Sequence, residues 1–215
     1  SWWAAAMLFA YAAFFSYAYR DLSAATVALL LFGAVQMTMT GYGLFRGERL
    51  GGLKLTGVLV AVAGLVTLLL PGLAAPPLLG AAFMILAGAS WGVYSLLGKS
   101  LGEPTIATAG NFLRAVPFAA ALALAGSHGT SGVDMTGALY AVLSGAITSG
   151  LGYALWYAAL PALTATSAAT VQLSVPAIAA LGGVLLLAEP ITIRLLLASA
   201  AILGGIALTI ARPKA

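Results

Sequence analysis

Long apolar runs, separated by short polar connections, fill almost the whole chain. They predict helices over residues 2–19, 23–45, 53–70, 78–98, 105–125, 136–159, 163–188 and 192–211. Each run has roughly the 20 residues that a helix needs to cross the hydrocarbon core of a bilayer. The strict alternation of apolar and polar residues that membrane barrel strands require does not occur. The pattern therefore predicts an all-α fold, a polytopic transmembrane helix bundle with eight visible spans.

Composition supports a membrane location and excludes several functions. Of 215 residues, 62% are hydrophobic and 7% are charged, and the mean hydropathy is +1.09. A domain in water cannot bury that much apolar surface, whereas a bilayer favours it. The net charge of +4 does not indicate a nucleic-acid partner, because the basic residues lie in short connections. Since the chain has no cysteine, disulfides and cysteine metal sites are excluded, and we expect no metal and no cofactor.

The basic residues predict an orientation in the membrane. One side of the predicted bundle collects Arg46, Arg49, Lys54, Lys99, Arg212 and Lys214, and the other collects Arg20 and Arg194. Cytoplasmic loops carry an excess of Lys and Arg. We therefore expect a multi-pass protein of the cytoplasmic (inner) membrane, with both ends of this chain in the cytoplasm.

An internal repeat is visible in the second and seventh runs. The segment Ser23-Ala24-Ala25-Thr26 recurs as Ser167-Ala168-Ala169-Thr170, and in each copy an aromatic-rich helix precedes it. An acidic residue ends the run in both copies, Glu48 in the first and Glu189 in the second. The charge count places these two acids on opposite sides of the membrane, so the copies are predicted to be inverted.

The two copies differ in length. The second copy has two additional spans in front of it, 78–98 and 105–125, and the first has none. We therefore expect a fragment of a ten-span protein that lacks its first two spans; the alternative is a natural eight-span variant. The predicted parts are the last three spans of a first repeat, a linker, a five-span second repeat and a cytoplasmic tail, over residues 1–70, 71–77, 78–211 and 212–215.

Several short motifs, in a fixed order, carry a resemblance to a known family. They are Gly47-Glu48-Arg49-Leu50, Gly57 and Gly64, Ser90-Trp91-Gly92-Val93-Tyr94, the run from Tyr153 to Tyr157, Ser174-Val175-Pro176 and Ala188-Glu189-Pro190. In these features the chain resembles the drug/metabolite transporter superfamily, specifically the EamA-like family of paired five-helix repeats. It departs from that pattern at Gly33 to Gln36, where such repeats often carry a proline. The resemblance implies a secondary transporter that exports or exchanges small metabolites by alternating access, which makes efflux of amino-acid-like or other small amphipathic or anionic solutes the expected activity.

Arg114 is the charged residue that lies inside a predicted span. A charge at the centre of a bilayer costs at least about 2.5–3.5 kcal/mol, so such a residue faces the bundle interior or water and has a partner. Asn111, three residues earlier, shares its helix face. The acidic residues all lie at span ends or in loops: Asp21, Glu48, Glu103, Asp134 and Glu189. Arg114 is therefore predicted either to bind a carboxylate or phosphate of the substrate, or to be a structural arginine bonded to carbonyl groups or to an acid in the missing spans.

Other polar and aromatic side chains are candidates for a substrate cavity. Gln36 and Gln172 lie on stripes of small residues in the second and seventh spans, where a cavity and close packing are both compatible with the pattern. Trp91 and Tyr94 share a face of the fourth span, and Tyr153 lies beside Trp156 on the sixth. At helical spacing, Trp156 continues a stripe formed by Ser144, Thr148 and Gly152. These aromatic residues are predicted to form pocket walls, or alternatively to face lipid or pack in the bundle.

The remaining features concern mechanism and partners. Pro176 predicts a kink and a gate in the seventh span. The two repeats are expected to rock around a cavity near Gln36, Asn111, Arg114 and Gln172. Neither paired carboxylates nor a Ser/His/Asp set suggests an enzyme, and His128 lies in a predicted external loop. The small-residue pair Ala201 and Gly205 permits a homodimer. The expected partners are a small-molecule substrate and the lipid bilayer; the competing function is a non-transporting membrane scaffold or assembly subunit.

Overall fold

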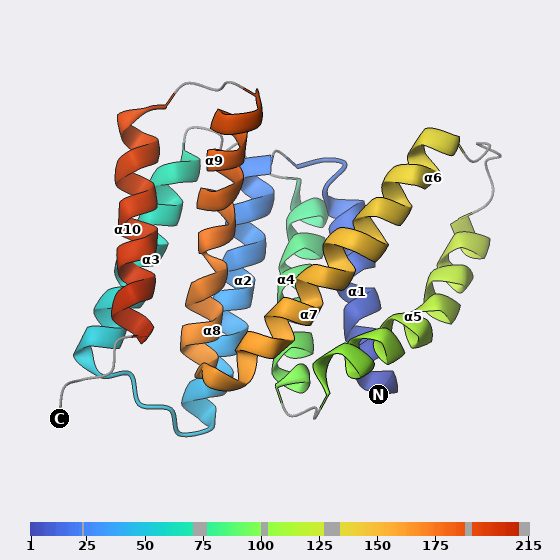
Figure 1. Ribbon diagram of the computed structural model, residues 1–215, viewed down its shortest axis with the longest axis horizontal. Helices are drawn as coiled ribbons and strands as arrows, with labels where there is room; N and C mark the ends of the chain where they lie inside the picture. Colours follow the sequence, from blue (N-terminus) through green and yellow to red (C-terminus); the bar gives the residue numbers. More distant parts are fainter. Residues whose placement is uncertain (23, 71–76, 100–102, 127–133, 188–190, 211–215) are drawn as a thin grey trace.

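The computed structural model describes residues 1–22, 24–70, 77–99, 103–126, 134–187 and 191–210, and in these ranges every regular element is helical (Figure 1). The first five helices are α1 (Trp2–Ala18), α2 (Ala24–Phe45), α3 (Gly52–Leu69), α4 (Leu78–Gly98) and α5 (Pro104–Gly126). They are followed by α6 (Met135–Val142), the π-helix η2 (Leu143–Ser149), α7 (Gly150–Ala159) and the 3-10 turn η3 (Leu160–Ala162). The chain ends with α8 (Ala165–Gln172), α9 (Ser174–Leu187) and α10 (Ile193–Ile210). The predicted all-α fold is confirmed.

The lengths of these helices fit a polytopic membrane bundle. In the described ranges, six helical segments are long and apolar enough to cross a membrane. The helix α1 is apolar but has 17 residues, and the predicted span 163–188 is divided into α8 and α9. The predicted span 136–159 corresponds to α6, η2 and α7, which follow one another without a break. His128 and Glu189, which the sequence analysis singled out, lie outside the described residues.

Pro176 accounts for the division of the seventh span. A proline has no N–H for the carbonyl four residues before it, and its ring clashes with that carbonyl. The carbonyl in question belongs to Gln172, which is the last residue of α8. The next residue, Leu173, donates its N–H to Thr170 O and Val171 O, and α9 begins at Ser174. The predicted kink is therefore observed as a break between two helices.

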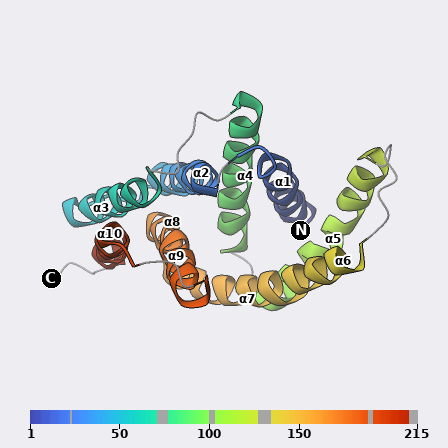
Figure 2. The same ribbon diagram turned by 90° about the horizontal axis from the view of Figure 1, so that it is seen from above.

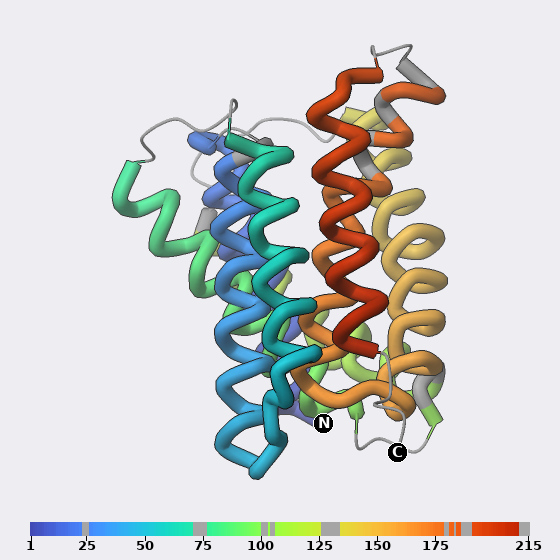
Figure 3. The backbone as a smooth tube through the Cα atoms, turned by 90° about the vertical axis from the view of Figure 1, so that its left-hand side faces the viewer, coloured from blue at the N-terminus to red at the C-terminus, as the bar shows by residue number. Residues whose placement is uncertain are grey.

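Glycines bring α3 and α10 into backbone contact at one edge of the bundle, as all three overall views show (Figures 1, 2 and 3). A Cβ atom at Gly57 would lie 2.6 Å from the carbonyl oxygen of Gly205, and one at Gly205 would lie 2.5 Å from that of Gly57. Side chains at these positions would force the helices apart. Gly205 therefore faces α3 of its own chain, and the homodimer stays a prediction.

The helix α4 packs against α1 and α2 in the middle of the bundle. A Cβ atom at Gly88 would lie 2.5 Å from Leu31 O, and one at Gly92 would lie 3.0 Å from the Thr38 side chain. The face of α4 that is turned toward α1 and α7 carries aromatic side chains instead, among them the buried Tyr94. The helix α4 therefore holds α2 close on one side and contributes aromatic rings on the other.

Three helices run opposite to their counterparts in the second half of the chain. In Figure 1, α1 rises from its first residue whereas α6 to α7 descend; α2 descends whereas α8 to α9 rise; α3 rises whereas α10 descends. We call the lower end in this view, where Glu48, Lys54 and Lys99 lie, the Glu48 end. The other end, where α1 stops shortly before Arg20, is the Arg20 end.

Candidate functional site

A cavity of about 520 Å³ lies between α1, α5 and the segment formed by η2 and α7. Its lining is mostly aromatic or small and apolar: Leu8, Phe9, Tyr11, Ala12, Phe15, Ser16, Phe112, Ala115, Val116, Ala119, Ser144, Ser149 and Tyr153. None of these lining residues is charged, and the polar groups are hydroxyls. Cavities of roughly 300–1,000 Å³ with apolar walls and a few polar groups are typical of sites for small molecules.

A second cavity, of about 440 Å³, continues from the first along α1 and α5. The two share Phe9, Ala12, Ser16 and Ala119, and the second is also lined by residues later in both helices, including Tyr17 and Leu122. Since α1 and α5 both run toward the Arg20 end, these later residues lie nearer that end (Figure 1). The site therefore extends toward the Arg20 end of the bundle.

Aromatic rings from four helices meet beneath the larger cavity. The ring centroids of Tyr11 and Trp91 are 5.2 Å apart, and those of Trp91 and Tyr153 are 5.1 Å apart. Phe112 lies 5.4 Å from Tyr153, and Tyr94 lies 5.9 Å from Trp91. These separations are within the range of favourable aromatic pairs, so the cavity floor is a packed cluster of rings.

The π-helix η2 changes which residues of the sixth predicted span face the cavity. The sequence predicted a stripe of Ser144, Thr148 and Trp156 at α-helical spacing, with Tyr153 beside it. The cavity is lined instead by Ser144, Ser149 and Tyr153. A π-helix takes more residues per turn, which moves the cavity-facing position from residue 148 to residue 149. Thr148 points elsewhere and donates its hydroxyl to Ser144 O at 2.7 Å.

One of the predicted site residues, Gln172, supports Trp91 from behind. The indole N–H of Trp91 donates a hydrogen bond to Gln172 Oε1. Gln172 Nε2 in turn donates to Met39 Sδ at 3.3 Å and to Ala168 O at 3.4 Å. Gln172 is 7% exposed, so it lies behind the ring cluster and does not line the cavity. The last residue of α8 thereby holds the orientation of a ring that contacts the cavity walls.

Asn111 and Tyr94 are also brought together, behind Phe112. Asn111 is 1% exposed, and its Nδ2 donates to the Tyr94 hydroxyl at 3.5 Å. Trp156 takes a separate position, where its indole N–H donates to Ser95 Oγ at 3.3 Å. Neither Asn111 nor Trp156 is among the lining residues of the two cavities described above.

Gln36 connects α2 with α8 at a distance from the ring cluster. Its Nε2 donates to Thr40 Oγ1 at 3.0 Å and to Thr170 Oγ1 at 3.4 Å. Gln36 is buried, and within the described residues its Oε1 accepts no hydrogen bond. The structure therefore places it in a contact between helices, not in the walls of the cavity.

Arg114 does not face the cavity. The cavity-facing residues of α5 include Phe112, Ala115 and Ala119, whereas the Arg114 side chain is exposed. Its Nη1 donates to the Gly110 carbonyl, one turn earlier in the same helix, at 2.8 Å. This hydrogen bond is of the kind that the structural interpretation of Arg114 expects.

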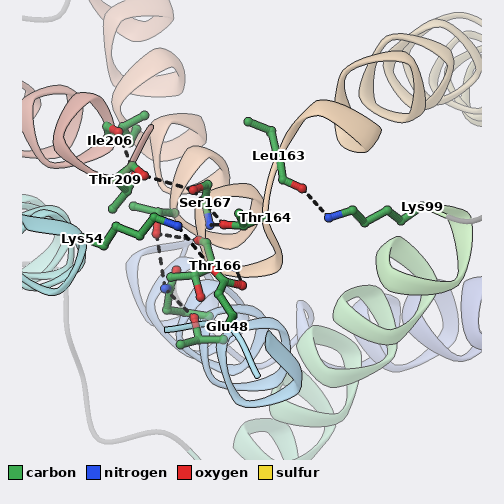
Figure 4. Close-up of polar contacts among 12 residues, drawn as sticks. Glu48, Lys54, Lys99, Leu163, Thr164, Thr166, Ser167, Ile206 and Thr209 are labelled. Carbon is green, nitrogen blue, oxygen red and sulfur yellow. Dashed lines mark hydrogen bonds and ion pairs between the residues drawn. The ribbon is translucent and has the colours of Figure 1, made fainter. Parts of the chain in front are cut away.

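The bundle is tied together at the Glu48 end, below the ring cluster (Figure 4). Lys99 Nζ donates to Leu163 O, and Ser167 Oγ donates to Thr209 O at 3.1 Å. Glu48 Oε2 accepts from the Thr166 N–H at 3.3 Å. These bonds attach the start of α8 to α4, α10 and the turn after α2 at this end of the bundle.

The charge of Glu48 is stabilised where it lies. Its Oε1 is 3.6 Å from Lys54 Nζ, and the two side chains are 13% and 25% exposed respectively. Burial acts to raise the pKa of Glu48, but the hydrogen bonds offered by Thr164 and Thr166 and the charge of Lys54 outweigh it and hold the pKa below its usual value. Glu48 is therefore ionised at neutral pH.

Several cavity residues were missed by the sequence analysis. Tyr11 and Phe15 belong to an aromatic run that was used only as a landmark of the repeat, although their spacing places both on one helix face with Leu8. Phe112 was passed over beside Asn111. Ser149 lines the cavity because of the π-helical turn, which α-helical spacing does not predict.

A family model and two relatives match this chain. The family model for the EamA-like transporter family matches residues 78–211. An uncharacterized protein of Pseudomonas aeruginosa is 60% identical over 210 residues, which are 98% of this chain and 73% of that protein. An uncharacterized transporter of Archaeoglobus fulgidus is 28% identical over 167 residues, which are 76% of this chain and 59% of the relative. The chain thus spans less than two thirds of that transporter's length.

A solved structure shows the same fold. The crystal structure of another protein superposes with a TM-score of 0.79 at 22% identity, over 96% of this chain and 75% of that chain. At this identity the likeness concerns the fold alone. The family is shown by the family model, which matches more than half of the chain: the chain belongs to the EamA-like transporter family of the drug/metabolite transporter superfamily, whose members are membrane transporters of small solutes.

Proposed function

We propose that the cavity between α1, α5 and α7 is the solute site of a secondary transporter that exports or exchanges small amphipathic solutes. The observation that carries this proposal is the aromatic-walled cavity of about 520 Å³ in a chain of a transporter family. A cavity of this size accommodates a metabolite-sized molecule. Its rings offer stacking surfaces, and the hydroxyls of Ser16, Ser144 and Ser149 offer hydrogen bonds.

The chemistry of the lining narrows the solute class. A charged group leaving water needs a counter-charge or several hydrogen bonds, otherwise its desolvation is not compensated. None of the lining residues is ionised, and Arg114 lies on another face of α5. The preferred solute is therefore a neutral or zwitterionic molecule with an aromatic or other apolar part, and a multiply charged phosphate compound is disfavoured.

The proposed mechanism is alternating access. The cavity continues toward the Arg20 end, while hydrogen bonds join the helices at the Glu48 end. The opposite directions of the helices in the two halves are what inverted repeats would produce, and such repeats can exchange an outward-open for an inward-open arrangement. The break at Pro176 provides the hinge, and Pro176→Ala tests it: transport at the native rate would remove the hinge from the mechanism.

We further propose that the Glu48 end faces the cytoplasm of a cell with this protein in its inner membrane. In the described residues, Arg46, Arg49, Lys54 and Lys99 lie toward this end. This is the basic excess that marks cytoplasmic ends of membrane helices. In the arrangement described, the solute site would then open to the outside, as an exporter does after it has carried its solute across.

The experiment is solute flux in proteoliposomes that contain the full-length protein. The panel holds aromatic and aliphatic amino acids, phosphorylated metabolites and organic cations, each measured with and without unlabelled competitor. Saturable flux of aromatic or other amphipathic solutes supports the proposal. Flux confined to phosphorylated compounds would contradict the proposed solute class, and the lack of saturable flux from well-folded protein would favour a membrane scaffold.

A further inference from the structure

The Gly47-Glu48 pair at the end of α2 has no part in the solute site. Gly47 has φ +85°, a left-handed conformation that side chains rarely adopt. Its N–H donates to Leu44 O at 2.9 Å, and the N–H of Glu48 donates to Gly43 O at 2.8 Å. This pair of bonds is the Schellman motif that ends many helices. The motif reverses the direction of the chain at Gly47 and thereby fixes the position of Glu48.

Glu48 reaches from this turn to the first residues of α8. Its Oε2 accepts the N–H of Thr166, the second residue of that helix, at 3.3 Å. The first N–H groups of a helix lack partners within the helix and carry partial positive charge, so an ionised carboxylate is favourable there. Gly43 leaves the necessary room, because a Cβ atom at this position would lie 2.5 Å from Glu48 Oε2.

The helix α8 links this contact to the solute site. At its start, Thr164 accepts the N–H of Ser167 at 3.2 Å, and Glu48 accepts the N–H of Thr166. At its other end, Gln172 accepts from Trp91, whose ring packs on the cavity walls. With eight residues, α8 connects the contacts at the Glu48 end, which Figure 4 shows, to the aromatic cluster through Gln172.

We propose that the Gly47-Glu48 pair is a lock on α8: the carboxylate caps α8 while the Glu48 end is closed, and has to leave it when that end opens. Glu48 is thus a positioning residue for transport, and the proposal rests on the alternating access described above. Lys54 contributes less to the lock than Thr166 does, since its partly exposed ion pair with Glu48, at 3.6 Å, adds little to stability.

Single reporter cysteines test the lock, because the chain contains none of its own. Ala169, on α8, is 1% exposed and becomes accessible to a hydrophilic maleimide when the Glu48 end opens. Ala18, 0% exposed near the Arg20 end of α1, reports general loosening. The modification rates of Ala169→Cys and Ala18→Cys are measured in full-length protein in nanodiscs, with and without Glu48→Ala.

The expected result is selective. Loss of a helix cap corresponds to about a five- to tenfold shift in an opening equilibrium. Glu48→Ala should therefore raise the rate at Ala169→Cys about five- to tenfold and leave Ala18→Cys unchanged. Glu48→Gln keeps an acceptor oxygen but loses the charge, so it should raise the rate about threefold; it is also the milder variant if Glu48→Ala does not fold. Arg49→Ala removes a charge from the same turn and should change neither rate by more than about twofold.

Two results would overturn the lock. An unchanged rate at Ala169→Cys in both Glu48 variants would show that α8 is held without the carboxylate. An equal rise at both reporters would show that Glu48 stabilises the whole bundle and not one end of it. Both outcomes are independent of the flux assay, in which a lack of saturable transport by the native protein overturns the proposed function instead.

Discussion

Small residues serve opposite purposes at two helix contacts of this bundle. Between α3 and α10, Gly57 and Gly205 face each other and the two backbones touch. Between α1 and α5, the small residues Ala12 and Ala119 instead line a cavity. The difference lies in the course of the helices, since α3 and α10 stay together along their length whereas α1 and α5 diverge (Figures 1 and 2).

Pro117 gives α5 a reason to diverge. It lies inside the helix, where it removes the hydrogen bond to the carbonyl of Leu113 and bends the helix. The cavity residues Phe112, Ala115 and Ala119 lie on both sides of it in the sequence. A stripe of small residues therefore produces contact between straight helices and a cavity beside a bent one, and the stripe alone does not distinguish the two.

The largest expected effect is at the tight contact. Gly205→Leu places side-chain atoms against Gly57 O and the backbone of Ala61, neither of which can yield without separating α3 from α10. We expect a loss of about 3 kcal/mol, at the upper end of the overpacking range. The measurement is thermal unfolding in detergent, followed by size-exclusion chromatography. Gly204→Leu is the matched control, because a Cβ atom at Gly204 meets nothing within 4 Å; equal losses in both variants would refute the backbone contact.

A smaller loss is expected beneath the cavity. Trp91→Phe removes the donor to Gln172 Oε1 and leaves a buried acceptor without a partner, which costs roughly 1–3 kcal/mol. Replacing both partners, as in Trp91→Phe with Gln172→Met, should restore part of that loss because no polar atom is stranded. Chemical or thermal unfolding of the native protein, Trp91→Phe and the double variant measures these differences in stability. If the double variant is no more stable than Trp91→Phe, the hydrogen bond is not the cause.

The next effect depends on pH and concerns the Glu48 end. The pKa of Glu48 is lowered from 4.5 on folding, so the unfolded chain takes up its proton first as the pH falls. The stability contributed by the Glu48 charge is then complete above about pH 5.5 and disappears as the pH falls through the folded-state value, below 4.5. The unfolding temperatures of native protein and Glu48→Gln should differ at pH 7 and converge as the pH falls below the folded-state pKa of Glu48. If the difference between the two unfolding temperatures grew as the pH falls, it would contradict a lowered pKa of Glu48.

The smallest effect is expected at Arg114. Its side chain bonds to the Gly110 carbonyl and lies away from the cavity, so Arg114→Ala should change solute flux by less than about twofold. The assay is initial-rate uptake by proteoliposomes, normalised to folded protein. Loss of flux with an unchanged unfolding temperature would instead indicate that Arg114 binds the substrate.

The sequence was sufficient for the helices and for part of the ring cluster. Turn residues and span length define helix ends, and α4 has the predicted bounds, 78–98. Trp91, Tyr94 and Tyr153 were expected together because each lies on the same face of its helix as other polar or aromatic residues. These predictions depend on local geometry, which the sequence encodes directly.

The rest depends on features that local spacing does not contain. Membrane helices are apolar on every side, so periodicity does not tell which face of α5 meets the cavity, and it left a substrate-binding and a structural role of Arg114 open. The π-helix η2 shifts the register by one position. The cavity is therefore lined by Ser149 and not by Thr148, which α-helical spacing predicted. The role of Glu48 required knowing that α8 begins beside the turn after α2, a contact between residues more than a hundred positions apart.

The central claim is that the α1–α5 cavity holds the solute, and filling it is the most direct test. Ala119→Phe projects a ring into the cavity, whereas Ala121→Phe places the same ring on another face of α5. The measurement is kcat/KM for flux of the best solute of the panel in proteoliposomes, with unfolding temperatures recorded on the same preparations. The account predicts at least about a tenfold fall for Ala119→Phe and less than about a twofold change for Ala121→Phe. Native flux in a well-folded Ala119→Phe variant would contradict it, because the solute would then pass elsewhere.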